Sequence, residues 1–198
     1  MDSQSSSDKG PSGRGANQGW KIEPEKLQRN YSPTRPPEVT HLLYEIQWKK
    51  NLKTWKNWCT SNPNQHAEIN FLENAWKEIR RKTRPCSITW FLSWSPCHAC
   101  SQRIIEFLET HPKVTLEIRA AQLFKHQVEC NQNGLRDLAN FGVKISIMHL
   151  PDYQYCWRTF VVPQEHGEEY WPWHFFPRII SCSQSLCSIL KVRGYLKN

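Results

Sequence analysis

Apolar and polar side chains alternate from Thr40 to Lys49, a pattern that is typical of a half-buried β-strand. The apolar face of this predicted strand carries Leu42, Tyr44, Ile46 and Trp48. A second strand is expected from Lys53 to Cys59, because the turn-rich residues 60–64 end it. The two strands predict a hairpin. The hairpin carries a basic cluster that consists of Lys49, Lys50, Lys53 and Lys56. This cluster is either an ordinary solvated face or a set of contacts to phosphates.

A helical period replaces the alternation from His66 onward. Apolar residues then recur at helical spacing, at Ile69, Leu72, Ala75, Trp76 and Ile79. The basic run 80–82 suits the negative end of a helix dipole and is expected to close this helix. Residues 86–94 carry apolar side chains on both faces, which predicts a fully buried strand. A second helix should follow at once, with Ser95 as its N-cap and Pro96 at its first position.

The second half of the chain alternates strands and helices. Strands are predicted over 114–121 and 143–150 with a helix over 131–141 between them, an order that implies a parallel pair. Asp152 is expected to cap a further helix. A last amphipathic helix is expected to bury Ile179, Ile180, Leu186, Ile189 and Leu190. The predicted fold class is therefore α/β, an α/β/α sandwich whose mixed sheet of about five strands has helices on both faces.

Composition bounds the domain organisation. The 198 residues are 38% hydrophobic and 12% aromatic, which is enough for one domain with a core of its own. Residues 1–19 contain almost no apolar side chains and are expected to form a disordered tail, so that 20–198 make a single domain. A helical turn near Pro24 should place Leu27 in the core. No apolar run approaches the roughly 20 residues that span a bilayer, so we expect no membrane association.

Charge and cysteine content narrow the classes of function. The net charge of +8 favours a polyanionic partner such as nucleic acid, and a merely basic soluble protein is the alternative. The N-terminus has no apolar signal segment, which indicates an intracellular protein. In a reducing compartment the eight cysteines are more often buried thiols or metal ligands than disulfides.

Two short stretches, His66-Ala67-Glu68 and Cys97-His98-Ala99-Cys100, carry the chemistry. One histidine nitrogen and two cysteine sulfurs suit a catalytic zinc, which keeps its fourth position for water. Glu68 is placed to move the proton of that water, and the H-x-E…P-C-x-x-C spacing is the signature of zinc deaminases of nucleobases. His98 should point to another face of its helix. Buried thiols, a disulfide and a zinc site without catalysis are the alternatives.

Longer motifs surround these ligands. They are residues 66–68, 90–100 and 152–157, together with 22–24, 42–46, 86–90 and 134–138. The first three resemble the AID/APOBEC family of polynucleotide cytidine deaminases. The other four are similar to the branch that forms the catalytic subunit for editing of apolipoprotein B messenger RNA. The resemblance extends from about Ile22 to about Trp173, and it implies a cytidine-deaminase-like fold with one catalytic Zn²⁺.

The resemblance implies hydrolytic deamination of cytosine to uracil in single-stranded RNA or DNA, either as mRNA editing or as a mutator or antiviral activity on DNA. Glu68 would move the proton, first to the ring nitrogen and then to the departing ammonia. Substrate contacts are expected from Thr40, Asn62, Trp94, Ser95, Phe124 and Lys125, with residues 124–126 reading the nucleotide before the target. An auxiliary RNA-binding protein, a homodimer, and a location in cytoplasm and nucleus are also expected.

Some residues depart from the family pattern. Gln122 stands where many members carry arginine, and Lys125 and His126 are not the commonest residues of their loop. Two other functions therefore stay open at this point. A silent protein that coats single strands is disfavoured by the intact Glu68. A free-nucleoside deaminase is disfavoured by the net charge of +8 and by the predicted parallel strand pair.

Overall fold

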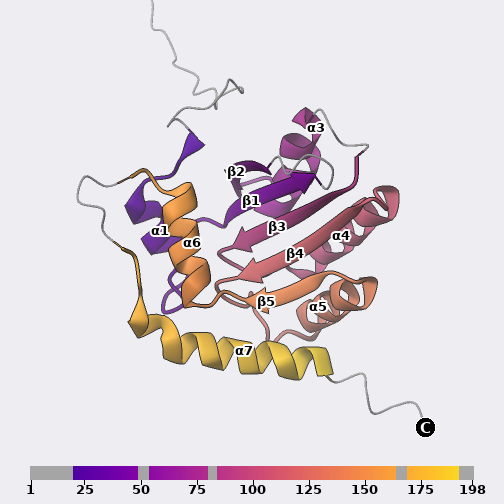
Figure 1. The fold of residues 1–198 in the computed structure, drawn as a ribbon. Coiled ribbons are helices and arrows are strands. Elements are labelled where there is room, and N and C mark those ends of the chain that lie inside the picture. The colour runs from indigo at the N-terminus through magenta and orange to yellow at the C-terminus, as the bar shows by residue number, and fades with distance from the viewer. Residues whose placement is uncertain (1–19, 49–53, 80–83, 164–168, 192–198) are drawn as a thin grey trace, which may run out of the picture.

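The computed structural model describes residues 20–48, 54–79, 84–163 and 169–191. Its five-stranded sheet has the order β2-β1-β3-β4-β5 (Figure 1). The strands are β1 (His41–Trp48), β2 (Thr54–Thr60), β3 (Cys86–Leu92), β4 (Val114–Ala120) and β5 (Lys144–Ile147). β1 is antiparallel to both β2 and β3, whereas β3, β4 and β5 are parallel. The predicted tail 1–19 and the lysines at 49, 50 and 53 lie outside the described residues.

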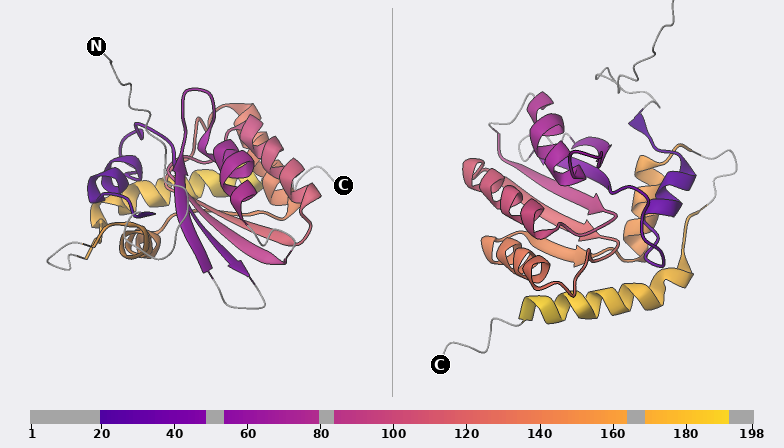
Figure 2. Two further views of the ribbon diagram at one scale, coloured as in Figure 1. Left: turned by 90° about the horizontal axis from the view of Figure 1, so that it is seen from above. Right: turned by 180° about the vertical axis from the view of Figure 1, so that it is seen from behind.

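Helices cover both faces of the sheet, which confirms the predicted fold class. They are α1 (Pro24–Asn30), α2 (Ala67–Asn70), η2 (Phe71–Ala75), α3 (Trp76–Glu78), α4 (His98–Thr110), α5 (Glu129–Phe141), α6 (Leu150–Phe160), η3 (Trp173–Phe175) and α7 (Phe176–Lys191). The two views in Figure 2 show α3, α4 and α5 on one face, with α1 and α6 on the other. α7 packs along β5 and α5. Among the described residues, no helix has the length and apolarity needed to cross a bilayer.

β1 is buried on both faces over its first half, which the alternation did not predict. Leu42 and Tyr44 belong to the core beneath α2 and α4, and Leu43 belongs to the core beneath α1 and α6. Only Glu45 and Gln47 keep the second face polar. Because β1 lies between β2 and β3 and both layers of helices reach its first residues, neither of its faces is left to solvent there.

The helix after His66 contains an unpredicted π-helical turn, η2, between α2 and α3. Phe71, which the predicted spacing left out of the core, is fully buried and packs edge-on against Tyr44 and Trp90. The wider π turn brings residues five apart onto one face, so Phe71 and Trp76 face the core together. The described helix ends at Glu78, and the basic run expected to close it lies outside the described residues.

Two boundaries and one buried position in the C-terminal half differ from prediction. β5 ends at Ile147, and His149 is the N-cap of α6. Asp152 is the third residue of that helix, and its carboxylate accepts a hydrogen bond from the backbone N–H of His149 in a capping box. In α7, Ile179, Leu186 and Ile189 are buried as predicted, but Ile180 is 39% exposed.

The predicted parallel pair of β4 and β5 is confirmed. A second parallel pair, β3 and β4, places the candidate residues at one edge of the sheet. β3 and β4 run in the same direction, so the loops after Leu92 and Ala120 leave the same edge of the sheet. β1 is antiparallel to β3, so its first residue, His41, lies at this edge too, and its backbone N–H donates to the hydroxyl of Ser93. The motif that opens α4 therefore lies beside the loop that precedes α5.

Candidate active site

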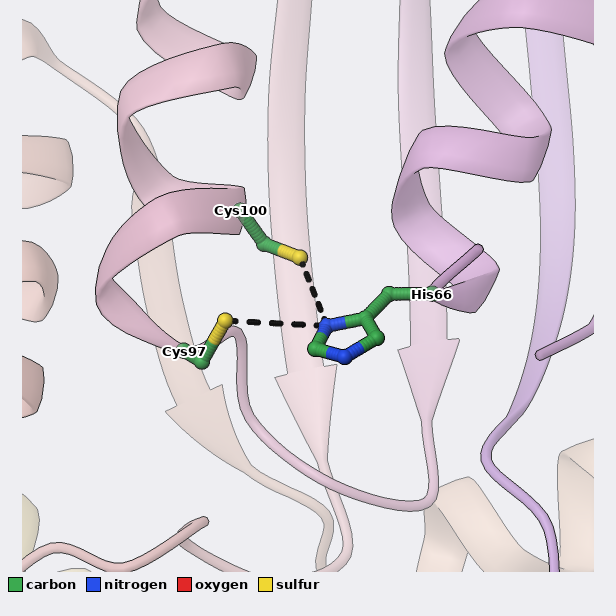
Figure 3. A group of neighbouring side chains, drawn as sticks. All are labelled: His66, Cys97 and Cys100. Carbon is green, nitrogen blue, oxygen red and sulfur yellow. Dashed lines mark hydrogen bonds between the residues drawn. The ribbon is translucent and has the colours of Figure 1, made fainter. Parts of the chain in front are cut away.

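His66, Cys97 and Cys100 come together at this edge, with their ligand atoms within 4.8 Å of one another. His66 Nδ1 lies 3.2 Å from Cys100 Sγ and 3.6 Å from Cys97 Sγ. Figure 3 shows both sulfur atoms facing this one ring nitrogen. Cys100 is buried, Cys97 is half-buried and His66 is exposed, so the group opens to solvent on the histidine side.

The first turns of two helices place these ligands. His66 is the N-cap of α2, and Cys97 is the N-cap of α4, where Cys100 is the third residue. The prediction that Ser95 caps α4, with Pro96 as its first residue, is wrong. Ser95 instead donates its N–H to the Gln122 carbonyl, and its hydroxyl accepts from the Phe124 N–H. Because Ser95 is engaged in this way, the helix begins two residues later.

The donor set fits zinc. Zinc bonds of about 2.3 Å to sulfur and 2.0 Å to nitrogen, at tetrahedral angles, separate the nitrogen and sulfur atoms by about 3.5 Å. The observed separations of 3.2 and 3.6 Å are close to this value. His98 is not part of the group, as predicted, and its backbone N–H donates to Asn131 Oδ1. Three ligands are the number that a catalytic zinc takes from protein.

The two thiols differ in acidity. A hydrogen bond from the Cys100 thiol and the neighbouring His66 together lower the pKa of Cys97 to about 5. The same hydrogen bond and burial raise the pKa of Cys100. Cys97 is thus a thiolate at neutral pH before any metal is considered, and a thiolate is the form that binds metal.

Glu68 lies in the first turn of α2 and is only 3% exposed. Burial raises the pKa of its carboxyl to about 7. A hydrogen bond with the Cys100 thiol acts in the opposite direction and places the carboxyl beside the metal ligands. A carboxyl group that gains and loses its proton near neutral pH suits general acid–base catalysis.

Trp94 and Phe124, both expected to contact substrate, lie against each other on two loops. Their rings meet edge to face, with centroids 5.7 Å apart. Both side chains are half-buried, so neither is a core residue. The ammonium group of Lys125 lies 5.3 Å from the centroid of the Phe124 ring. Among the non-glycine residues that the structure describes, Lys125 is the one with a positive φ, which is 37°. This pair presents aromatic surface with a cation beside it.

The other predicted contacts lie at the same edge. The Thr40 N–H donates to the Ser61 hydroxyl, and the Ser61 N–H donates to the Thr40 carbonyl. Asn62 is exposed four residues before His66, and its side-chain oxygen accepts from the Asn64 N–H. Ser95 is 2% exposed and ties two loops together, so its hydroxyl is a structural group in this arrangement.

Two buried polar residues of this edge were not predicted to have a role. Asn131 accepts from the His98 N–H and donates to the Lys125 carbonyl, so it joins the start of α4 to the Phe124 loop. Gln122 joins the same loop to the chain between α1 and β1. The signal of Gln122 in the sequence is a lone polar residue between apolar ones, in Ala121-Gln122-Leu123, which also fits an ordinary loop, and Asn131 stands in a polar run that gives no signal.

A polar groove of about 270 Å³ lies away from the metal ligands, beside α6. Glu45, Lys56 and Tyr155 line it and satisfy one another, since Lys56 and Tyr155 both donate to the Glu45 carboxylate. None of the metal ligands lines this groove. The chemistry therefore belongs to the sheet edge with His66, Cys97 and Cys100.

Comparison with known proteins agrees with this geometry. A model of the family described as APOBEC4-like AID/APOBEC deaminase matches residues 30–162. The C-to-U-editing enzyme APOBEC-1 of Homo sapiens is 45% identical over 169 residues, which are 84% of this chain and 70% of the human protein. APOBEC-1 of Mus musculus is 47% identical over 154 residues, or 77% and 66% of the two chains.

A more distant relative extends the comparison. The DNA dC-to-dU-editing enzyme APOBEC-3G of Lagothrix lagotricha is 32% identical over 159 residues, which are 80% of this chain and 38% of that protein. The family match covers the whole stretch from the end of α1 to the end of α6, including the metal ligands and both loops beside them. This chain belongs to the AID/APOBEC deaminase family.

Proposed function

We propose that this protein catalyses the zinc-dependent hydrolytic deamination of cytosine to uracil in single-stranded RNA or DNA. The observation that carries the proposal is the buried carboxyl of Glu68, hydrogen-bonded to Cys100 within the His66, Cys97 and Cys100 group. The names of the relatives support it, because APOBEC-1 is called a C-to-U-editing enzyme and APOBEC-3G a DNA dC-to-dU-editing enzyme.

His66 Nδ1, Cys97 Sγ and Cys100 Sγ would hold the metal. Bound zinc supplies a water that is acidic enough to act as a nucleophile near neutral pH. Glu68 would accept one proton of that water and deliver it to the ring nitrogen while the water oxygen bonds to C4 of cytosine. Glu68 would then carry the second proton of that oxygen to the amino group, the C4–N bond would break, and ammonia would leave. Cytosine and water thus become uracil and ammonia, and the Glu68 carboxyl returns to its initial protonation state.

The surroundings of the site favour a strand over a free nucleoside. Trp94 and Phe124 offer half-buried rings on which bases stack, a contact worth about 1–3 kcal/mol per base. Lys125 and a net charge of +8 attract phosphates. A free nucleoside has no phosphates and no neighbouring base, so it would use neither feature.

Deamination of oligonucleotides tests the proposal. Purified protein with zinc is incubated with single-stranded DNA, single-stranded RNA and cytidine, and uracil is measured. We expect turnover on at least one polynucleotide and a loss of about 10²–10⁴-fold in Glu68→Gln. The matched control is Glu73→Gln, on the same helix but exposed and paired with Arg103, which should keep its activity.

Each outcome separates the candidate functions. Turnover on cytidine alone would show a nucleoside deaminase. Tight binding of single strands without turnover would show a silent coating protein. Full activity in Glu68→Gln would remove the assigned role of that residue. The affinity for strands should fall steeply with added salt, since phosphate contacts release counterions, and a flat salt response would argue against the basic surface.

We also propose that this protein works with an auxiliary RNA-binding protein, that it forms a homodimer, and that it is located in the cytoplasm and the nucleus. The resemblance to the mRNA-editing branch supports the auxiliary protein and the location. The exposed apolar side chains of Trp173, Phe176 and Ile180, which follow one another at helical spacing, support a homodimer. Recovery of editing by added cell extract tests the auxiliary protein, sedimentation of the purified protein tests the homodimer, and imaging of a tagged protein tests the location.

A further inference from the structure

Gln122 lies where three segments of the chain meet. It is 7% exposed and follows β4 by two residues. Its carbonyl accepts from the Ser95 N–H at 2.8 Å, next to the metal ligands. Its side-chain nitrogen donates to the carbonyl of Ser32 at 2.7 Å and to that of Arg35 at 2.6 Å. A primary amide has two donor hydrogens, so both are used to hold the chain between α1 and β1.

The segment 31–40 is anchored at its two ends by other groups. The Tyr31 hydroxyl contacts the carbonyls of His41 and Phe91, and the Val39 N–H donates to Asn30 Oδ1. Residues 32–35 lie between these anchors. Ser32 and Pro33 are buried, and in the described part of the chain the other hydrogen bond that residues 32–35 accept from a distant segment is a long one, from Arg178 to the Pro33 carbonyl at 3.4 Å. Gln122 is thus the short-range link that fixes the middle of this segment.

The hydrogen bonds of Gln122 lie between a cationic residue, Arg35, and the loop that carries the aromatic ring of Phe124. The side chain of Arg35 is exposed, while its carbonyl is held by Gln122. Phe124 is two residues beyond Gln122 and presents its half-buried ring beside Trp94. Phosphate contacts fix the register of a strand on a protein, and base contacts read its sequence. Gln122 therefore connects the backbone at Arg35 to the loop that carries Phe124.

We propose that Gln122 is a positioning residue that sets the preference for the nucleotide adjacent to the target cytosine. It holds Arg35 as a phosphate contact at a fixed place relative to the ring of Phe124. This role rests on the proposed function, because a single strand must lie across this edge of the sheet. If residues 32–35 lose their hydrogen bonds to Gln122, Arg35 still attracts phosphate. The nucleic-acid strand then binds in more than one register, and the site no longer discriminates between the bases next to the target.

Two substitutions of Gln122 test the role. Gln122→Glu keeps the shape but points carboxylate oxygens at two carbonyls, and Gln122→Met keeps the volume without any donor. Gln184→Glu on α7 is the control, since it makes the same charge change at an exposed position. The substrates are single-stranded DNA and RNA oligonucleotides with one cytosine that differ only in the nucleotide on either side of it.

In the wild type, kcat/KM on the best and worst neighbours should differ at least fivefold, the factor that corresponds to about 1 kcal/mol of stacking. Both Gln122 variants should reduce this ratio to less than twofold, and the control should keep it. Hydrogen exchange in residues 31–40 should accelerate in the Gln122 variants. A uniform loss of rate with an unchanged ratio, unchanged exchange in that segment, or a wild type without preference would overturn the proposal.

Binding separates this role from the catalytic one. If the wild type deaminates none of the oligonucleotides, the proposed function fails, and the ratio of their affinities, measured by fluorescence anisotropy, decides the role of Gln122 by the same criterion. Arg35→Gln should weaken binding of every oligonucleotide by a similar factor and reduce the slope of log affinity against log salt by about one. An unchanged slope would overturn the phosphate contact.

Discussion

The backbone N–H of Phe124 donates a 2.9 Å hydrogen bond to the hydroxyl of Ser95. Ser95 lies two residues before the metal ligand Cys97, and Phe124 carries the ring that faces Trp94. The loop that opens α4 and the loop that precedes α5 are therefore fixed to each other at the sheet edge. The buried Ser95 hydroxyl, together with the Ser95 N–H bond to the Gln122 carbonyl, thus holds the metal ligands close to the stacking surface.

Replacing Ser95 with alanine should lower the free energy of unfolding by about 1–3 kcal/mol, because a partly buried N–H loses its acceptor. Chemical denaturation measures the change. Ser188→Ala on α7 is the comparison, since it removes an exposed hydroxyl that donates to a helix carbonyl, and it should stay within about 0.5 kcal/mol of wild type. Equal effects in the two variants would contradict the role assigned to Ser95.

Gly134→Ala should destabilise the protein by about 1–3 kcal/mol and weaken zinc retention, because α4 and α5 touch at this glycine. An added Cβ would lie 3.0 Å from His98 Cα, between the two cysteine ligands, and 2.9 Å from Ser101 Oγ.

Gly142→Ala provides the matched control for that substitution. Its φ of 104° makes alanine strained, yet nothing lies within 4 Å of the added carbon. Both variants should melt at lower temperature than wild type, but only Gly134→Ala should lose zinc to a competing chelator. If both variants retain zinc equally, the close approach of the helices does not support the metal site.

Cys97→Ser and Cys100→Ser should each reduce bound zinc from one per chain to nearly none. The loss of a ligand should cost more than the 10–100-fold in affinity that loss of an outer-shell partner costs. Metal analysis after dialysis measures the content. Cys130→Ser removes an exposed cysteine outside the group and should retain one zinc. A full zinc content in either ligand variant would disprove this ligand set.

Stability should fall as the pH drops below about 6.5, in part because of His41. Burial lowers the pKa of this imidazole, which stacks on Trp58, and Nδ1–H donates to the Val39 carbonyl. A lowered pKa in the folded state means that protons favour the unfolded chain. The contribution is complete above the unfolded pKa and is lost as the pH falls through the folded one. Denaturation between pH 7.5 and 5 should show a smaller pH dependence in His41→Gln.

Local patterns along the chain were enough to predict the strands, the hairpin of β1 and β2, and one parallel pair. The apolar run at 86–94 identified the central strand β3, and the strand–helix–strand order from 114 onward predicted the parallel pair of β4 and β5. The exceptions have tertiary causes. Phe71 is buried because of a π-helical turn. Ser95 does not cap α4, because its hydroxyl accepts a hydrogen bond from the Phe124 loop. Neither effect has a signature in a run of neighbouring residues.

The sequence by itself singled out His66, Glu68, Cys97 and Cys100 as candidate ligands and candidate proton carrier, because these residue types stand at a diagnostic spacing. Only the tertiary structure decided that Cys97 caps its helix, that Glu68 is buried with a raised pKa, and that Gln122 holds residues 32–35. The physical reason is that burial and long-range hydrogen bonds depend on which segments meet. Residues 90 positions apart, such as Ser32 and Gln122, become neighbours only when the sheet has formed.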